Sequence, residues 1–113
     1  MSYQAYEDSK KILLLDPPYY GVIAAAAIVA TPEQKAKITE AWGKQLRSRE
    51  FDLKYGIQLV NEHEDWTAEA YLMAAILVSD TNNLWLFDQL FHDLLVERKA
   101  RYNAPGGRLP EDE

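Results

Sequence analysis

The side chains best suited to catalysis or metal binding are two histidines that lie among carboxylates. His92 follows Asp88 by four residues, a spacing that places both on one face of a helix. His63 lies between Glu62 and Glu64. Imidazole and carboxylate groups bind divalent metals, but nothing in the sequence brings the two clusters together. We interpret them as solvated side chains and predict no metal site and no cofactor.

Residues 16–20 contain two short motifs of known chemistry. Asp-Pro-Pro-Tyr is similar to the tetrapeptide with which amino-methyltransferases hold the amino group of adenine or cytosine. Those enzymes also need a glycine-rich loop, and this chain has no Gly-x-Gly sequence. Pro-Pro-Tyr-Tyr also matches the Pro-Pro-x-Tyr ligand of WW domains, which requires an exposed polyproline segment. A capping aspartate followed by prolines at the start of a helix explains both motifs more simply.

No side chain is placed for covalent catalysis. The chain has no cysteine, and none of its four serines is flanked by the glycines of a nucleophile elbow. A length of 113 residues fits one domain, which excludes enzymes with separate cofactor and substrate domains. We therefore expect a non-enzymatic protein.

Apolar segments are too short for membrane insertion. The stretch from Val22 to Ala30 falls well short of the roughly 20 residues that span a bilayer. Residues 1–8 lack the basic and apolar regions of a signal peptide. We expect a cytoplasmic protein that does not contact a membrane.

Charge is distributed unevenly along the chain. Residues 61–97 contain eight acidic side chains and no lysine or arginine, whereas residues 32–60 have a small basic excess. Direct nucleic-acid binding is disfavoured, because phosphate neutralisation needs a concentrated basic stripe. The acidic segment is either a solvated face that aids solubility or a docking surface for a basic partner protein. The predicted contacts with such a partner are Glu62, Glu64, Asp65, Glu69, Asp88 and Asp93.

Large apolar side chains lie on more than one side of the helix predicted around residues 83–87. Trp85 or Leu86 should face outward unless another helix covers it. Together with Phe91 they are candidate anchors for a partner or a homo-oligomer, since aromatic side chains dominate interface energies. The alternative is a central helix that is covered all round.

Capping residues and prolines mark the helix boundaries. Asp16-Pro17-Pro18 predicts a helix from Pro17, and Thr31-Pro32-Glu33-Gln34 predicts one from Pro32 with a capping box. Further helices should begin at residues 65–67 and at residue 81 or 82, the last continuing to residue 103. The basic residues 98, 99 and 101 complement the dipole at the end of that helix.

Apolar spacing separates buried from amphipathic helices. Residues 21–30 and 71–78 are apolar nearly all round, so these helices should be buried, whereas the helices from Pro32 and residue 82 are amphipathic. Residues 26–31 and 74–79 are also similar to one another, which allows two packed helical hairpins. We predict an all-α, single-domain bundle of five or six helices over residues 1–103, with a C-terminal tail at 104–113.

One segment is ambiguous between helix and strand. Residues 51–59 alternate apolar and polar side chains, as a half-buried strand does. The other candidate strand is Lys11 to Leu15, and an isolated two-stranded ribbon is only marginally stable. We assign residues 51–61 to a helix and keep the strand as the alternative.

Asp-Pro-Pro-Tyr-Tyr near the start and Arg-Tyr-Asn-Ala-Pro-Gly-Gly near the end resemble short uncharacterised proteins of bacteriophages and mobile elements. The resemblance implies a source context and no activity. With the acidic segment it suggests an inhibitor of counter-defence type that occupies a basic host protein. One alternative is a phage structural or assembly protein, or a chaperone, that self-associates through the aromatic helix face. Another is a helical small-molecule binder whose pocket is lined by Tyr19, Tyr20, Tyr71 or Trp42.

Overall fold

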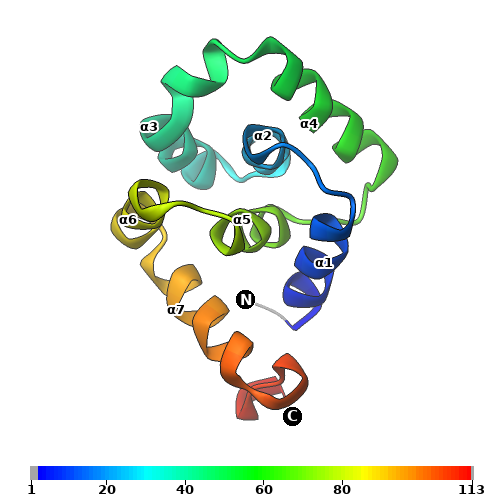
Figure 1. The fold of residues 1–113 in the computed structure, drawn as a ribbon, viewed down its shortest axis with the longest axis vertical. Coiled ribbons are helices and arrows are strands. Elements are labelled where there is room, and N and C mark those ends of the chain that lie inside the picture. Colours follow the sequence, from blue (N-terminus) through cyan, green and yellow to red (C-terminus); the bar gives the residue numbers. More distant parts are fainter. Residues whose placement is uncertain (1–2, 113) are drawn as a thin grey trace.

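The computed structural model describes residues 3–112, which form seven α-helices and two short 3₁₀ helices (Figure 1). In chain order they are α1 (Tyr3–Leu14), α2 (Tyr19–Val29), α3 (Pro32–Arg47), α4 (Glu50–Glu62), α5 (Ala68–Leu77), α6 (Thr81–Leu90), α7 (His92–Asn103), η1 (Pro105–Gly107) and η2 (Pro110–Asp112). These residues contain no strand. The predicted all-α class is confirmed, with seven helices where five or six were expected.

The two helices without a polar face lie at the centre of the molecule. α2 and α5 run side by side, with α3 and α4 around α2, and α1, α6 and α7 around α5 (Figure 1). α2 buries residues 21–26, and α5 buries residues 68 and 70–76. Many of these side chains are alanines, which allows the helix backbones to approach closely. The prediction of two buried helices is therefore confirmed for residues 21–26 and 71–76, whereas Ile28, Val29, Leu77 and Val78 at their C-terminal ends are exposed.

Residues 50–62 form α4, so the strand alternative is wrong. Phe51 and Ile57, which create the alternating pattern, are 75% and 50% exposed. The buried face consists instead of Gly56 and Leu59, three residues apart as in a helix. The other candidate strand, Lys11 to Leu15, lies mostly within α1. No strand partner is therefore available in residues 3–112.

Side-chain caps fix the starts of the amphipathic helices. Thr31 and Gln34 form the predicted capping box, in which the Thr31 Oγ1 accepts from the Gln34 backbone N–H at 3.2 Å and the Gln34 Oε1 accepts from the Thr31 N–H at 2.9 Å. Asp80 caps α6 by accepting from the Asn83 backbone N–H at 2.8 Å. These caps satisfy helix-terminal donors that otherwise lack partners.

Two predicted boundaries are wrong. α2 begins at Tyr19 rather than Pro17, because Pro18 is extended and Asp16 has a positive φ of 50° and does not cap the helix. The predicted helix from residue 82 to residue 103 is broken at Phe91, whose φ and ψ are −134° and 45°. The break lets α6 and α7 run in different directions (Figure 1), with Phe87 and Leu94 both buried in the core.

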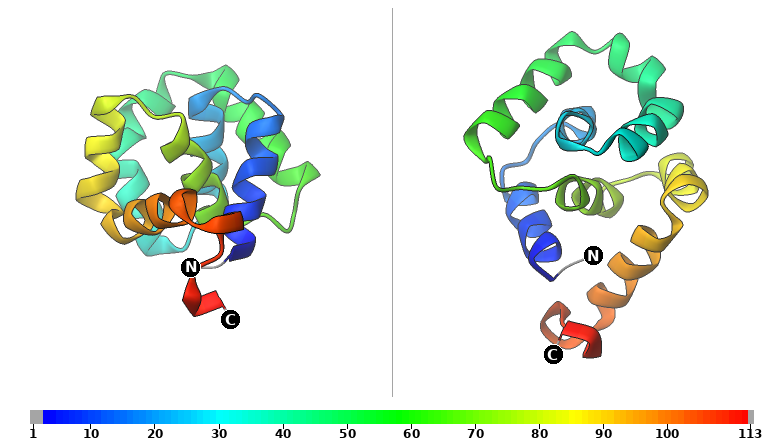
Figure 2. Two further views of the ribbon diagram at one scale, coloured as in Figure 1. Left: turned by 60° about the horizontal axis from the view of Figure 1, so that its bottom comes forward. Right: turned by 180° about the vertical axis from the view of Figure 1, so that it is seen from behind.

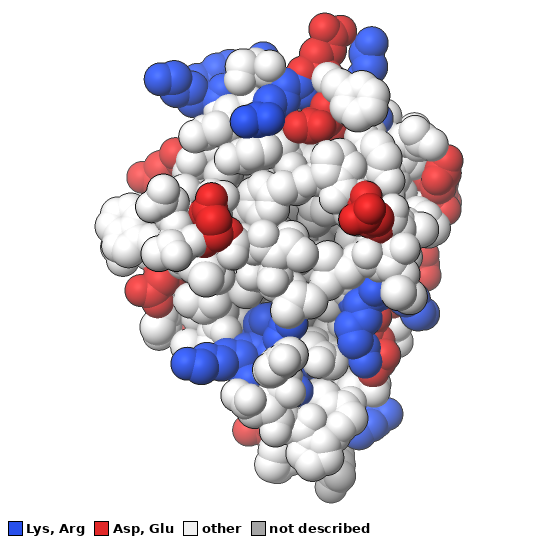
Figure 3. Space-filling view, viewed as in Figure 1, with Lys and Arg blue, Asp and Glu red and all other residues white. Residues whose placement is uncertain are grey.

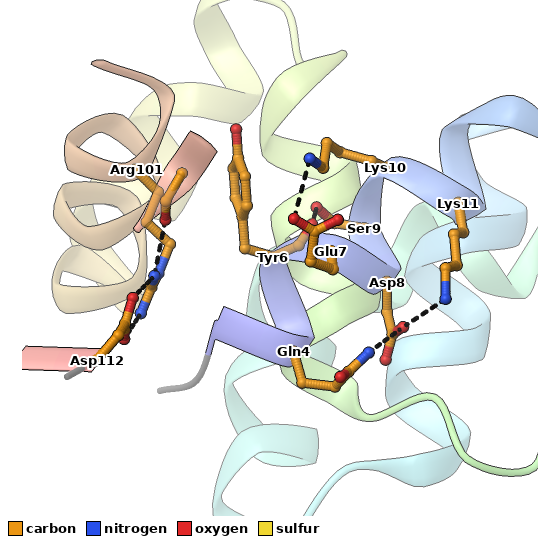
Figure 4. A network of polar contacts seen from close by, with 10 residues as sticks. Gln4, Tyr6, Glu7, Asp8, Ser9, Lys10, Lys11, Arg101 and Asp112 are labelled. Atoms are coloured by element: carbon orange, nitrogen blue, oxygen red, sulfur yellow. Dashed lines mark hydrogen bonds and ion pairs between the residues drawn. The ribbon is translucent and has the colours of Figure 1, made fainter. Parts of the chain in front are cut away.

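The last described residues fold back onto the molecule. The Arg101 guanidinium donates to both carboxylate oxygens of Asp112, at 2.7 and 2.9 Å, and to the Gly107 carbonyl at 2.9 Å (Figure 4). Gly107 has a φ of 72°, and its backbone lies so close to the Tyr6 ring that a Cβ would overlap the ring. Residues 104–112 thus pack at the end of α7 near the start of α1 (Figure 2).

Within the described part of the chain, no helix has the length and apolar content required to cross a membrane.

Candidate functional site

A groove of about 480 Å³ lies where α3 and α5 meet the junction of α6 and α7. Its acidic side chains come from the first turns of three helices: Glu33 on α3, Glu69 on α5 and Asp93 on α7. Carboxylates are favourable at these positions because helix N-termini carry partial positive charge. The groove, called the acidic groove below, is also lined by Gln34, Lys37, Leu72, Phe91 and neighbouring residues.

Polar contacts leave part of the acidic groove free for a partner. Gln34 Nε2 donates to Glu69 Oε1 at 3.0 Å, which orients that carboxylate. Lys37 Nζ lies 3.9 Å from Glu33 Oε1 and 5.6 Å from the centroid of the Phe91 ring. The Asp93 carboxylate is exposed and makes no hydrogen bond or ion pair with another residue of 3–112. The acidic groove is therefore lined by three carboxylates and a single ammonium group.

The structure brings together only part of the predicted acidic surface. Glu69 and Asp93 line the acidic groove, together with Phe91. Asp88 lies on α6 and contacts His92, which also lines the groove, with Oδ1 and Nδ1 2.8 Å apart. This pair spans the break at Phe91, so its two side chains belong to different helices rather than to one face of a single helix.

The other predicted acids, at the end of α4 and in the loop before α5, do not line the acidic groove. Glu62 accepts a hydrogen bond from Gln58 Nε2 at 3.0 Å. Glu64 and Asp65 are exposed. The nearby His63 ring stacks on Trp66, with centroids 3.9 Å apart. The predicted acidic surface thus consists of a groove cluster and a separate loop cluster.

No group of three or more histidine, aspartate or glutamate side chains within residues 3–112 is arranged to hold a metal ion. The two histidines instead have separate partners, an aspartate for His92 and a tryptophan ring for His63. Neither cluster therefore presents a metal-binding geometry.

The three predicted anchor residues do not share one exposed face. Trp85 is 62% exposed, whereas Leu86 and Phe91 are half-buried and pack against the core. The Phe91 ring lies 6.1 Å from the ring of buried Phe87. Trp85 is thus the side chain that faces outward, and Phe91 contributes an apolar wall to the acidic groove.

The aromatic side chains suggested as a ligand pocket belong mainly to the core. Trp42 and Tyr71 are fully buried, and Trp42 Nε1 donates to Asn83 Oδ1 at 2.8 Å. Burial raises the pKa of Tyr71 to about 12. Burial also raises the pKa of Tyr19 to about 12, although its hydroxyl contacts Ser79 Oγ at 2.8 Å. Both hydroxyl groups therefore stay neutral at physiological pH, and we interpret them as part of the packing of the core and not as contacts for a ligand.

Sequence reasoning missed Glu33 and Lys37, which also belong to the acidic groove. They lie in a segment with a small basic excess, so charge counting along the chain did not single them out. The capping box at Thr31 was the available signal, because it places Glu33 in the first turn of α3.

No protein-family model matches the chain, and searches of curated proteins and of solved structures find no significant similarity.

Proposed function

We propose that this protein is a non-enzymatic protein–protein interaction module that binds a basic segment of a partner in the acidic groove. The observation that carries the proposal is the convergence of Glu33, Glu69 and Asp93 on one groove that holds only one lysine. An arginine or lysine of the partner would pair with the free carboxylate of Asp93. Its aliphatic stem would pack on the Phe91 ring.

The finer form of the proposal is an inhibitor encoded by a phage or mobile element that occupies a basic site on a host protein in the cytoplasm. It is supported by the acidic segment at residues 61–97 and by the resemblance of the two chain ends. In this form the loop cluster of Glu62, Glu64 and Asp65 extends the contact beyond the acidic groove. Asp88, beside His92, contributes at the rim.

Charge reversal at Asp93 tests the proposal against a matched control. Asp93 and Glu50 are both exposed acids in the first turn of a helix, but Glu50 does not line the acidic groove. Tagged wild-type, D93K and E50K proteins are used for affinity capture from a host lysate, with washes at low and high salt. A partner retained by wild type and E50K, lost by D93K and released at high salt is the expected result. Equal capture by D93K and wild type would contradict it.

Self-association is a second candidate function, favoured by the exposed indole of Trp85. A structural or assembly protein, or a chaperone, would use this side chain as an interface anchor. Light scattering of wild-type and W85A proteins separates the two functions. A wild-type oligomer that W85A dissociates supports self-assembly, and a wild-type monomer rejects it.

A further inference from the structure

A second groove, of about 420 Å³, lies between α5, α6 and α7. Its walls are formed by the apolar side chains of Ile76, Leu77, Leu84 and Leu95. Its polar lining comes from Arg98 and Lys99 of α7 and from the neighbouring Tyr102. This groove, called the apolar groove below, shares no lining residue with the acidic groove.

Arg98 is a largely buried residue whose guanidinium has no carboxylate partner. The residue is only 6% exposed, and no carboxylate or hydrogen-bond acceptor of residues 3–112 pairs with it. Its guanidinium lies 5.6 Å from the centroid of the Tyr6 ring and 5.2 Å from that of Tyr102. Burial lowers the pKa of Arg98 below the ordinary arginine value.

Arg101, one turn further along α7, is an arginine of this fold that does have carboxylate partners, although its Nε makes no hydrogen bond. It is equally enclosed, at 2% exposure, but it contacts the carboxylates of Asp112 and Glu97. Buried charges in proteins are normally paired, because an uncompensated one is costly to remove from water. The guanidinium of Arg98 has no carboxylate partner and keeps solvent contact, so it is available to an anionic group supplied from outside through the apolar groove that it lines.

We propose that the apolar groove binds an amphipathic helix of a partner protein that presents apolar side chains and one carboxylate. The apolar side chains pack against Leu84 and Leu95, and the carboxylate pairs with Arg98. This is the helix-in-groove mode of recognition, with charge complementarity at one end. The inference does not depend on the acidic groove, because the two sites have different residues and opposite charge.

The surface around the apolar groove favours a macromolecule over a small amphiphile. Apolar exposure continues beyond the groove at Val78 and Trp85, which are 53% and 62% exposed. Figure 3 shows a largely uncharged face on which separate acidic side chains lie near the centre, with lysine and arginine side chains above, mixed with acidic ones, and below. An alkyl chain would cover only part of such a surface, whereas a helix covers the groove and its rim.

A second copy of this chain is a poorer match for the apolar groove. The exposed apolar side chains on its other helices are Leu14 on α1, Ile28 and Val29 on α2, and Phe51 and Ile57 on α4. α2 contains no acidic residue that could pair with Arg98. On α4, Lys54 lies between Phe51 and Ile57 in sequence and is itself exposed. Glu50, an exposed carboxylate of α4, lies 3.5 Å from Lys54, so docking of α4 would bring a carboxylate that is already paired with a cation toward Arg98.

The experiment selects peptide ligands with and without the Arg98 charge. A display library of helical peptides of about 15 residues, with leucines fixed along one face and the other positions randomised, is selected separately on wild-type protein and on R98M. K54M is the matched control, because it removes one positive charge from an exposed position outside the groove. Circular dichroism checks that each variant is folded. If R98M does not fold, K99E replaces it, because Lys99 lies at an exposed position on the edge of the groove.

The expected result is that peptides selected on wild type carry aspartate or glutamate beside the leucine face. They should bind R98M, or K99E, about 10- to 100-fold more weakly than wild type, and K54M equally well. NMR of the complex should show shifts at the methyl groups of Leu84 and Leu95. Selection of no peptide, selection of peptides without carboxylates, or equal affinity for R98M would each overturn the proposal. So would binding of dodecanoate alone, or wild-type self-association that R98M abolishes.

Discussion

Gly56 is the residue at which the fold is least able to accept an added methyl group. A Cβ at this position would lie 2.8 Å from the Cβ of Ala24 and 2.9 Å from the backbone nitrogen of Ala25. Backbone atoms cannot rotate away, so G56A must push α4 off α2. Gly43 offers a matched control in the middle of α3, because a Cβ there meets only the side chains of Thr39 and Arg47, at 3.2 and 3.3 Å.

The two substitutions make the same chemical change with opposite expected effects on stability. Alanine is favoured over glycine inside a helix by about 1 kcal/mol, so G43A should raise the free energy of unfolding by up to that amount. At Gly56 the same gain is outweighed by overpacking at the upper end of its usual range, about 3 kcal/mol, which leaves a net loss of about 2 kcal/mol. For a domain of this size the loss corresponds to a fall in Tm of about 8 °C or more.

Urea and thermal unfolding followed by circular dichroism measure both effects. The expected difference between G43A and G56A is about 3 kcal/mol in the free energy of unfolding. If G56A is as stable as wild type, or if both variants shift by the same amount, the close approach of α2 and α4 is not part of the native packing and the reasoning is refuted.

Three further predictions concern single contacts. W42F removes the indole donor to Asn83 and leaves a gap in the core, so the free energy of unfolding measured in urea should fall by about 2 to 4 kcal/mol. A smaller fall would mean that the contact contributes little. T31A removes the cap of α3 and should cost about 1 kcal/mol in the same assay, while an unchanged midpoint would show that the capping box is dispensable. The Arg101 guanidinium lowers the pKa of Asp112 from 3.8 to about 2, so this contact stabilises the fold above pH 3.8 and is lost as the pH falls toward 2. The free energy of unfolding of the wild type should fall across that pH range, and D112N should lack the part of this fall that comes from the Arg101–Asp112 contact. Parallel pH profiles of the two proteins would contradict the prediction.

The sequence predicted those parts of the fold that depend on local chemistry. Thr31 and Asp80 cap their helices because their side chains reach the N–H groups of the first turn. α2 and α5 lie at the centre because neither has a polar face to present to water. Such features are decided within a few residues of chain, so they can be predicted from sequence.

Features decided by tertiary contacts could not be predicted in this way. No proline or glycine marks the break at Phe91, and apolar side chains keep helical spacing on both sides of it. The alternation in residues 51–59 favoured a strand because it counted Phe51 and Ile57 as core residues, which are exposed. The contact that sets the position of α4 is made by Gly56, which has no side chain to contribute to a pattern.

The candidate sites were also predicted only as far as local sequence determines them. Counting acidic residues along the chain identified Glu69 and Asp93, but it also grouped them with Glu64 and Asp65, which lie in a different loop. Position along the chain carries no information on which helices pack against one another. Arg98 was interpreted as one of several cations that complement a helix terminus, and only the packing of α7 against Tyr6 shows that it is buried and unpaired.

The break at Phe91 is the structural feature on which both grooves depend. In a continuous helix, Leu84 and Leu95 would lie three turns apart on one straight face. Because the chain turns at Phe91, α6 and α7 run in different directions (Figure 2), and Leu84 of α6 and Leu95 of α7 both line the apolar groove. The same turn starts a new helix at His92, and the first turn of that helix places Asp93 in the acidic groove. One irregular residue therefore positions a carboxylate in one groove and an apolar wall in the other, and the two sites are expected to change together if this residue is forced into a helix.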